Sequence, residues 1–366
     1  MDARDRALFP ATLRGLKGRS AELTTLSRTV LATAPTRLAL VGAGGSGKSV
    51  LAAALAHRLT AHFAGGIHWF RVGAWDFRTL TEMLALRFGT TRERLALVPA
   101  LRDHLARGGE RLLVLDNHED DEAMAKLLDA LSGTPATFII TARRCLLAGV
   151  LIFPVTAPLI TSGRSAFPRV SQLTRSLRWN PLALDIADAI VASRGATVPQ
   201  LAEFLAKAGI ATCRVIDHED DLPEVAMLVA WAWKRLSAAS RRMLGVLAHI
   251  EGDSVDVESL ALLAKVKSAR ERQAALVALE QWHLVQEPMR GRYTVHAVVR
   301  HAVRKRTALS QTAVFEHYVS LLEKHPQRLM VEQTHLFAAM DHAHRASNLS
   351  AMLRIERLLQ QLDESA

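Results

Sequence analysis

The stretch Gly42-Ala43-Gly44-Gly45-Ser46-Gly47-Lys48-Ser49 matches the phosphate-binding pattern G-x-x-x-x-G-K-[ST] at every required position. A short apolar segment, residues 37–41, precedes it, and residues 49–58 carry leucine and alanine at helical spacing. The glycines therefore stand between a predicted strand and a predicted helix, which is the context that the pattern requires. This stretch predicts a binding site for a polyphosphate.

Each residue type of this loop has a physical task in binding phosphate. The glycines can take positive φ angles and bring backbone N–H groups against a polyphosphate, which the helix N-terminus also attracts. Lys48 would reach the β- and γ-phosphates, and the Ser49 hydroxyl would ligate Mg²⁺. A glycine-rich turn that only caps a helix is disfavoured because every fixed position matches. The predicted nucleotide-binding residues of the loop are Gly42, Gly44, Gly45, Ser46, Gly47, Lys48, Ser49 and Val50.

A second informative stretch, residues 111–117, is a hydrophobic segment that ends in the acid Asp116. A buried parallel strand would deliver this carboxylate to the carboxyl edge of the sheet, where it could hold the Mg²⁺ that Ser49 also ligates. An aspartate at a strand end is often only a helix cap, but its pairing with the glycine-rich loop favours the metal role. Asn117 cannot abstract a proton. The acids at 119–121 either position a water molecule or complement a helix dipole, and we favour the second interpretation.

Strand and helix patterns alternate from residue 37 to residue 155. Further strands are predicted at 67–72, 136–141 and 150–155. Helices are predicted at 77–88 and 92–106, and an earlier one follows residues 18–23 and runs to about residue 32. Such alternation predicts an α/β domain with a parallel sheet in three layers and a ligand at the carboxyl ends of the strands. Arg143 follows the strand at 136–141, where an arginine can sense a γ-phosphate, although surface arginines are common in this chain.

After Pro158 the pattern becomes helical. Helices are predicted at 165–177, 181–192, 198–208, 224–234, 237–249, 257–264 and 269–282. Two short β-type pieces, 284–286 and 292–294, then flank Met289-Arg290-Gly291 and precede a helix at 296–306, an order typical of a winged-helix unit. Helices at 311–323, 331–346 and 349–362 end the chain.

Six motifs in this order resemble the NB-ARC, or AP-ATPase, class of STAND NTPases, over about residues 16–306. The segment Leu336-Phe337-Ala338-Ala339-Met340 also looks like the start of the TPR-like helices that often follow in that class. The motifs are Gly18-Arg19-x-x-Glu22-Leu23, the glycine-rich loop, Leu112-Leu113-Val114-Leu115-Asp116-Asn117, Thr141-Ala142-Arg143, Asn180-Pro181-Leu182-Ala183-Leu184 and Tyr293-Thr294-Val295-His296.

The resemblance implies roles for residues outside the loop. It places Gly18 and Arg19 near the adenine, Pro181 against the base, and His296 on the β-phosphate of ADP, while Arg143 would sense the γ-phosphate. Without the resemblance, a histidine that only begins a helix would be the preferred interpretation of His296.

Two departures from the class matter for function. Trp179 stands where a glycine is usual before the Asn-Pro pair, which puts the detail of the adenine pocket in doubt. Asn117 in place of an acid suggests slow hydrolysis, which fits a switch better than a motor.

The charge balance leaves a second function open. Lys and Arg number 46 against 36 Asp and Glu, a formal net charge of +10, which raises nucleic acid as a partner. The basic residues Arg300, Arg304, Lys305 and Arg306 motivate an alternative, a DNA-binding P-loop ATPase that uses the winged helix. The dispersed arginines and the valines of the same helix argue against it.

Composition bounds the cellular context. Two cysteines cannot make a disulfide framework, and no signal peptide or transmembrane run is visible, so we expect a cytoplasmic protein with no membrane partner. No zinc-binding pattern occurs.

The sequence and the resemblance together predict an ATP/ADP-dependent switch. ADP and Mg²⁺ would bind in the resting state, and exchange for ATP would open the chain to an effector or sensor protein in trans, or to a second copy of itself. The catalytic residues would be Lys48, Asp116 and Arg143. The chain would be a fragment of a longer protein or the switch component of a multi-protein system. Its expected parts are an extension at 1–17, the P-loop NTPase domain at 18–158, a small helical domain at 159–222, a winged helix at 223–307 and C-terminal helices at 308–366.

Overall fold

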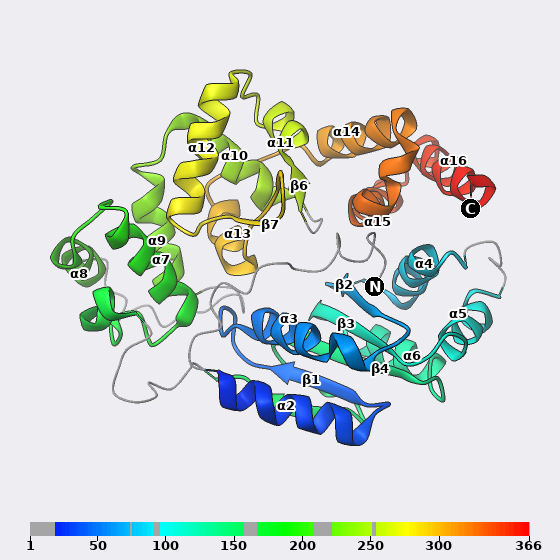
Figure 1. Cartoon of the computed structure of the whole chain (residues 1–366). Coiled ribbons are helices and arrows are strands. Elements are labelled where there is room, and N and C mark those ends of the chain that lie inside the picture. The colour runs from blue at the N-terminus through cyan, green and yellow to red at the C-terminus, as the bar shows by residue number, and fades with distance from the viewer. Residues whose placement is uncertain are drawn as a thin grey trace.

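The computed structural model describes residues 19–73, 75–90, 96–156, 167–207, 222–250 and 254–365. A five-stranded parallel sheet in the order β2-β3-β4-β1-β5 forms the first part of the chain (Figure 1). Its strands are β1 (Arg37–Val41), β2 (Ile67–Arg71), β3 (Arg111–His118), β4 (Ala136–Ala142) and β5 (Leu151–Pro154).

Helices cover both faces of this sheet because its strands alternate apolar side chains between two cores. Leu112 and Val114 of β3 face a core with helices α2 (Ser20–Thr33) and α3 (Lys48–Leu59). Leu113 and Leu115 face the opposite core, which helices α4 (Phe77–Phe88), α5 (Leu97–Ala106) and α6 (Asp121–Ala130) complete. The predicted three-layer α/β domain is therefore confirmed.

The second half of the described chain is helical with one small sheet. A hydrophobic cluster runs through it from Phe167 to Tyr318. Strands β6 (Val255–Asp256), β7 (Gln286–Met289) and β8 (Arg292–Thr294) form an antiparallel sheet in the order β6-β8-β7. The helices around it are α7 (Pro181–Ala192), α8 (Val198–Lys207), α9 (Pro223–Trp233), α10 (Ala238–His249), α11 (Val257–Leu263), α12 (Ala269–Gln281) and α13 (Ala297–Arg304).

Three helices close the chain: α14 (Gln311–Lys324), α15 (Leu329–Arg345) and α16 (Leu349–Ser365). Helix α15 lies over α4 of the first part, and Phe337 of α15 belongs to the same core as the α4 side chains (Figure 1). None of the helices that the structure describes is long and apolar enough to cross a bilayer.

Two predictions from periodicity were wrong. The segment predicted as a helix at 165–177 holds a 3₁₀ helix, η4 (Pro168–Leu173), followed by turns. Val170, Leu173 and Leu177 are buried, and this spacing fits a 3₁₀ turn as well as an α-helix. The first hairpin strand begins at Gln286 rather than at 284, because Leu284 and Val285 are buried in the core before the strand starts.

Candidate nucleotide-binding site

The glycine-rich loop links β1 to α3 with backbone angles that explain its glycines. Gly45 and Gly47 have φ angles of 73° and 93°, in the left-handed region that glycine populates readily. A Cβ atom on Gly42 would lie 2.3 Å from the carbonyl oxygen of Val155, so no side chain fits there. Gly47 precedes the first residue of α3, and the loop therefore presents a helix N-terminus to the site.

Lys48 lies at the first position of α3 and folds back over the loop. Its ammonium group donates to the carbonyl oxygens of Gly42 at 2.7 Å and Ala43 at 2.9 Å. This position keeps the charge beside the loop that would hold a polyphosphate.

The Asp116 carboxylate joins three elements of the domain. Its Oδ1 atom accepts hydrogen bonds from the hydroxyls of Ser49 at 2.7 Å and Thr141 at 2.6 Å. Strand β4 is the neighbour of β3 in the sheet, and both hydroxyls donate to the same oxygen of Asp116. A hydroxyl and a carboxylate are oxygen ligands that suit Mg²⁺, and the predicted pairing of Ser49 with Asp116 is present.

The acids after β3 belong to the start of a helix, as favoured from the sequence. Asp120 caps α6 by accepting from the backbone N–H of Ala123 at 3.0 Å. Asp121 pairs with His118 at 2.6 Å. The Asn117 amide donates to Glu119 at 2.7 Å, and its backbone N–H donates to the Thr141 hydroxyl at 2.9 Å.

The segment before α7 contacts the glycine-rich loop directly. Asn180 caps α7 through Ala183 N–H and donates from its amide to the carbonyl oxygen of Gly44 at 3.3 Å. Pro181 occupies the first helical position, as predicted.

Arg19, 3% exposed, donates to the carbonyl oxygens of Ser46 and Thr156 and pairs with Glu22.

One cavity of about 250 Å³ brings the loop and the hairpin β7–β8 together. Its volume is close to the lower end of the range for small-molecule sites, roughly 300 Å³. Gly44, Gly45, Gly47, Lys48, Ser49, Val50, Asp116 and Arg143 line it from the α/β domain, and Arg292, Thr294 and His296 line it from the hairpin and the start of α13.

The structure thus brings most of the predicted site residues to one cavity, including His296 from 248 residues after Lys48. His296 also caps α13, where its Nδ1 accepts from the backbone N–H of Val298 at 3.2 Å. Gly42, Ser46, Arg19 and Pro181 are not among the lining residues. Gly18 lies outside the described residues.

Three residues of the site carried no role in the sequence interpretation. Arg71 ends β2 opposite Asp116 in the strand register, and Thr141 is the last residue but one of β4. Both follow the rule that predicted Asp116, a polar residue at the carboxyl end of a parallel strand, and could have been found with it. Arg292 on β8 had no such signal because its place depends on the docking of the hairpin.

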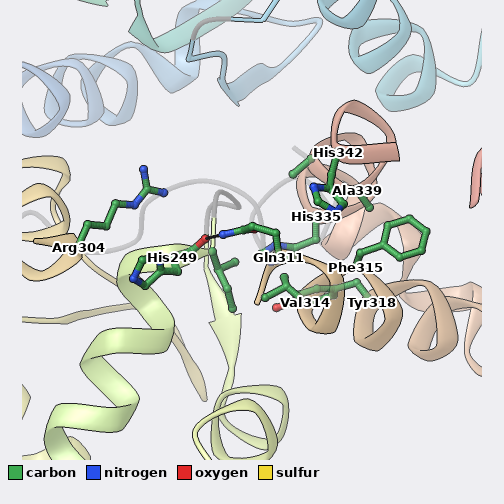
Figure 2. Close-up of a pocket in the computed structure, with 11 residues that line it drawn as sticks. His249, Arg304, Gln311, Val314, Phe315, Tyr318, His335, Ala339 and His342 are labelled. Atoms are coloured by element: carbon green, nitrogen blue, oxygen red, sulfur yellow. Dashed lines mark hydrogen bonds between the residues drawn. The ribbon is translucent and has the colours of Figure 1, made fainter. Parts of the chain in front are cut away.

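A second cavity, of about 280 Å³, lies where α10 and α13 meet α14 and α15 (Figure 2). Gln311 donates from its amide to the carbonyl oxygen of His249 at 3.2 Å across this seam. His335 and Tyr318 stack with ring centroids 4.0 Å apart, and burial lowers the pKa of His335 to about 4. At this seam the C-terminal helices contact the small-sheet region through the hydrogen bond from Gln311 to His249, beside the stacked rings of His335 and Tyr318.

Comparison with known proteins gives one curated relative in sequence. No protein-family model matches the chain. The regulatory protein AfsR of Streptomyces coelicolor is 25% identical over 327 residues, covering 80% of this chain and 32% of that protein. The chain therefore spans about a third of the relative's length.

Several solved structures share low similarity. Orc1 of Aeropyrum pernix in complex with DNA is 15% identical, covers 84% of this chain and 98% of that chain, and has a TM-score of 0.33. Cdc6p of Pyrobaculum aerophilum is 13% identical, with coverages of 84% and 99% and a TM-score of 0.36. DnaA of Aquifex aeolicus is 14% identical, with coverages of 87% and 97% and a TM-score of 0.29. At these TM-scores the similarity carries no functional argument.

The loop, the sheet order and the Ser49–Asp116 pair decide the fold of the first part. Residues 37–154 form a P-loop α/β domain.

Proposed function

We propose that this chain is an ATP- and ADP-dependent signal-transduction switch of the STAND type. ADP would hold the hairpin β7–β8 and His296 against the P-loop in the resting state, and exchange for ATP would release them. The observation that carries this proposal is the single cavity lined by both Lys48 and His296. A ligand that contacts both elements favours the state in which they are close, and this differential contact is what a switch needs.

The charges of the cavity suit a polyphosphate. Lys48, Arg71 and Arg143 line it from the α/β domain, against the single carboxylate of Asp116. Ser49 and Asp116 would hold Mg²⁺, which would supply charge neutralisation between the β- and γ-phosphates. Lys48 would bind the same phosphates, and Arg143 would respond to the third one.

Hydrolysis is proposed to be slow. The residue after Asp116 is Asn117, whose amide group cannot accept a proton and is held by Glu119. Asp116 itself is occupied by two hydroxyl donors. These contacts support a P-loop ATPase whose bound nucleotide persists, and the name of the AfsR relative, a regulatory protein, fits the same view. An effector protein or a second copy of the chain would bind after opening.

Calorimetry with ADP and ATP in the presence of Mg²⁺ tests the proposal. We expect the wild type to bind both nucleotides and the Lys48→Ala variant to lose about tenfold or more in affinity, since a charge-assisted phosphate contact is worth at least about 1.4 kcal/mol. The matched control is Lys126→Ala, because Lys126 lies exposed on α6 of the same domain, where it pairs with Glu122. Wild-type protein without nucleotide affinity, or equal affinity in the Lys48 variant, would refute the switch.

DNA binding through α13 is the second candidate. Val298, Val299 and Val303 are buried, as expected from the sequence, while Arg304, Lys305 and Arg306 lie exposed at the end of the helix. Two of the basic side chains are bound locally: Arg304 donates to Ala248 and Arg306 donates to Ala302. A salt titration decides: steep loss of DNA affinity with salt, abolished by replacing Arg300, Arg304, Lys305 and Arg306 with glutamine, would support this candidate, and no binding at low salt would eliminate it.

A further inference from the structure

Arg292 is the one hairpin residue that both lines the nucleotide cavity and forms an ion pair with the C-terminal helices, among the described contacts. Its Nη1 and Nη2 atoms donate to the two carboxylate oxygens of Glu332 on α15, each at 2.7 Å. Nε and Nη2 donate to the hydroxyl and carbonyl oxygens of Ser254 at 3.0 and 2.7 Å. This bidentate geometry fixes the hairpin strand β8 in orientation as well as in position.

The Arg292–Glu332 ion pair is buried, so separating its two charges costs free energy. Glu332 is fully buried and Arg292 is 7% exposed. Burial alone would raise the pKa of Glu332, but hydrogen bonds from Arg292 and Arg328 hold this pKa below its usual value. Arg328 also pairs with Asp256 of β6 at 2.9 Å. Ion pairs of Arg292 and Arg328 therefore connect β8 and β6 with Glu332 of α15, and removing a partner would leave a buried carboxylate with fewer donors.

The same helix is anchored on the α/β domain. Phe337, five residues after Glu332, is 2% exposed, and its ring centroid lies 6.0 Å from that of Trp75. Phe337 belongs to the core that α4 forms against the sheet. Helix α15 therefore contacts the α/β domain through Phe337 and the hairpin through Glu332, and its Val331 lines the same cavity.

From these contacts we propose that Glu332 is a positioning residue for the nucleotide site. By holding Arg292, Glu332 keeps the hairpin and the following His296 close to the P-loop. Nucleotide binding and the docking of α15 therefore favour each other. The proposal rests on the proposed nucleotide function. Coupling is reciprocal: nucleotide strengthens the docking of α15 by the factor with which docked α15 strengthens nucleotide binding, typically about 5- to 150-fold.

A double-mutant cycle on the full chain tests this coupling. The dissociation rate of a fluorescent ADP analogue is measured for wild type, Arg292→Met, Glu332→Met and the double variant. Each single variant removes one partner of the buried Arg292–Glu332 pair. Among the described residues, Glu332 then keeps only Arg328, or Arg292 keeps only Ser254, as a hydrogen-bond partner. We expect either single variant to release the analogue about tenfold faster. The double variant removes both charges of the pair, and we expect its dissociation rate for the analogue to return most of the way to the wild-type rate. If the two substitutions acted independently, their effects on this rate would instead add.

The matched control is Glu323→Gln on α14. Glu323 pairs with Arg354 of α16 in an exposed ion pair within the same C-terminal helices. Its substitution should leave the release rate within about twofold, because exposed pairs contribute little to stability.

The outcomes separate the inference from the function on which it rests. Wild-type protein that does not bind the analogue refutes the nucleotide function itself. Wild-type binding with unchanged release from folded Glu332→Met overturns only the role of Glu332. If the single variants do not fold, hydrogen exchange of the wild type decides: added ADP must slow exchange in residues 329–345, and unchanged exchange there overturns the coupling.

Discussion

The Thr141 hydroxyl orients the Asp116 carboxylate, the group that is proposed to hold Mg²⁺. It donates to Asp116 at 2.6 Å and accepts from the backbone N–H of Asn117 at 2.9 Å. Both contacts fix the direction of the carboxylate that would hold Mg²⁺. Residues that orient a ligand in this way are typically worth about 10- to 100-fold in metal affinity.

We therefore expect Thr141→Val to lower the affinity for Mg²⁺ in the presence of ADP by about tenfold. The substitution should also lower the free energy of unfolding by about 1–3 kcal/mol, because it leaves the Asn117 N–H without this acceptor. Titrations of ADP at several Mg²⁺ concentrations measure the first effect, and urea unfolding measures the second. Thr137→Val is the control: Thr137 is buried on the same strand and accepts from Thr36 N–H at 3.4 Å, away from Asp116. An equal change in Mg²⁺ dependence for both variants would contradict the role of Thr141.

At the scale of an element, the turn before α7 carries backbone strain where the resembling class has glycine. Arg178 and Trp179 have φ angles of 50° and 57°, in the left-handed region that costs ordinary residues about 1–2 kcal/mol. This turn lets Asn180 cap α7 and reach the carbonyl oxygen of Gly44. The departure at Trp179 thus keeps the conformation that a glycine would adopt without strain.

Comparing alanine with glycine at position 179 isolates this strain from the packing of the indole ring. We expect Trp179→Gly to unfold with a free energy about 1 kcal/mol higher than Trp179→Ala, since only glycine populates this φ freely. At Arg194, whose φ is 58°, the glycine variant should likewise have a higher free energy of unfolding than the alanine variant. Lys234 has a right-handed φ of −65°, so alanine should be the better residue there. Chemical unfolding of the six variants gives the answer, and a better alanine at 179 would argue against strain.

At the scale of the whole molecule, the seam between the small-sheet region and the C-terminal helices is sensitive to protonation. His335, labelled in Figure 2, is 3% exposed. Its Nε2 bonds to the carbonyl oxygen of Ser254 at 2.8 Å. Tyr318 stacks on it, Glu332 lies 3.5 Å away, and Arg292 is nearby in the same network. Burial lowers its pKa from 6.5 to about 4, so the folded chain binds this proton more weakly than the unfolded chain.

Stability should therefore rise with pH through this window. The contribution of neutral His335 is complete above pH 6.5 and is lost as the pH falls towards 4, a change of about 3 kcal/mol. Urea unfolding at several pH values should show that His335→Gln has a shallower slope than wild type. His325→Gln, at an exposed position, should keep the wild-type slope. A wild-type slope in the His335 variant would refute this prediction.

Local pattern was sufficient for most elements and for one half of the site. The glycine-rich loop, strand β3 that carries Asp116 and helix α4 (Phe77–Phe88) were predicted within a residue or two, because apolar periodicity and glycine placement act over a few neighbours. The 3₁₀ helix η4 and the start of strand β7 were not predicted. Local spacing of apolar residues does not distinguish an α-helix from a 3₁₀ helix or fix the first residue of a strand, because packing in the core decides both.

Only the tertiary structure decided what closes the nucleotide cavity. The sequence by itself determined that a phosphate-binding loop and an acid meet at the edge of a parallel sheet, because strand order constrains the ends of strands. The resemblance suggested His296, but nothing in the pattern marked Arg292 or Glu332. Their pairing joins residues 40 positions apart, and it exists only because β8 and α15 bury them together. Contacts between distant segments depend on packing and burial, which local periodicity does not encode.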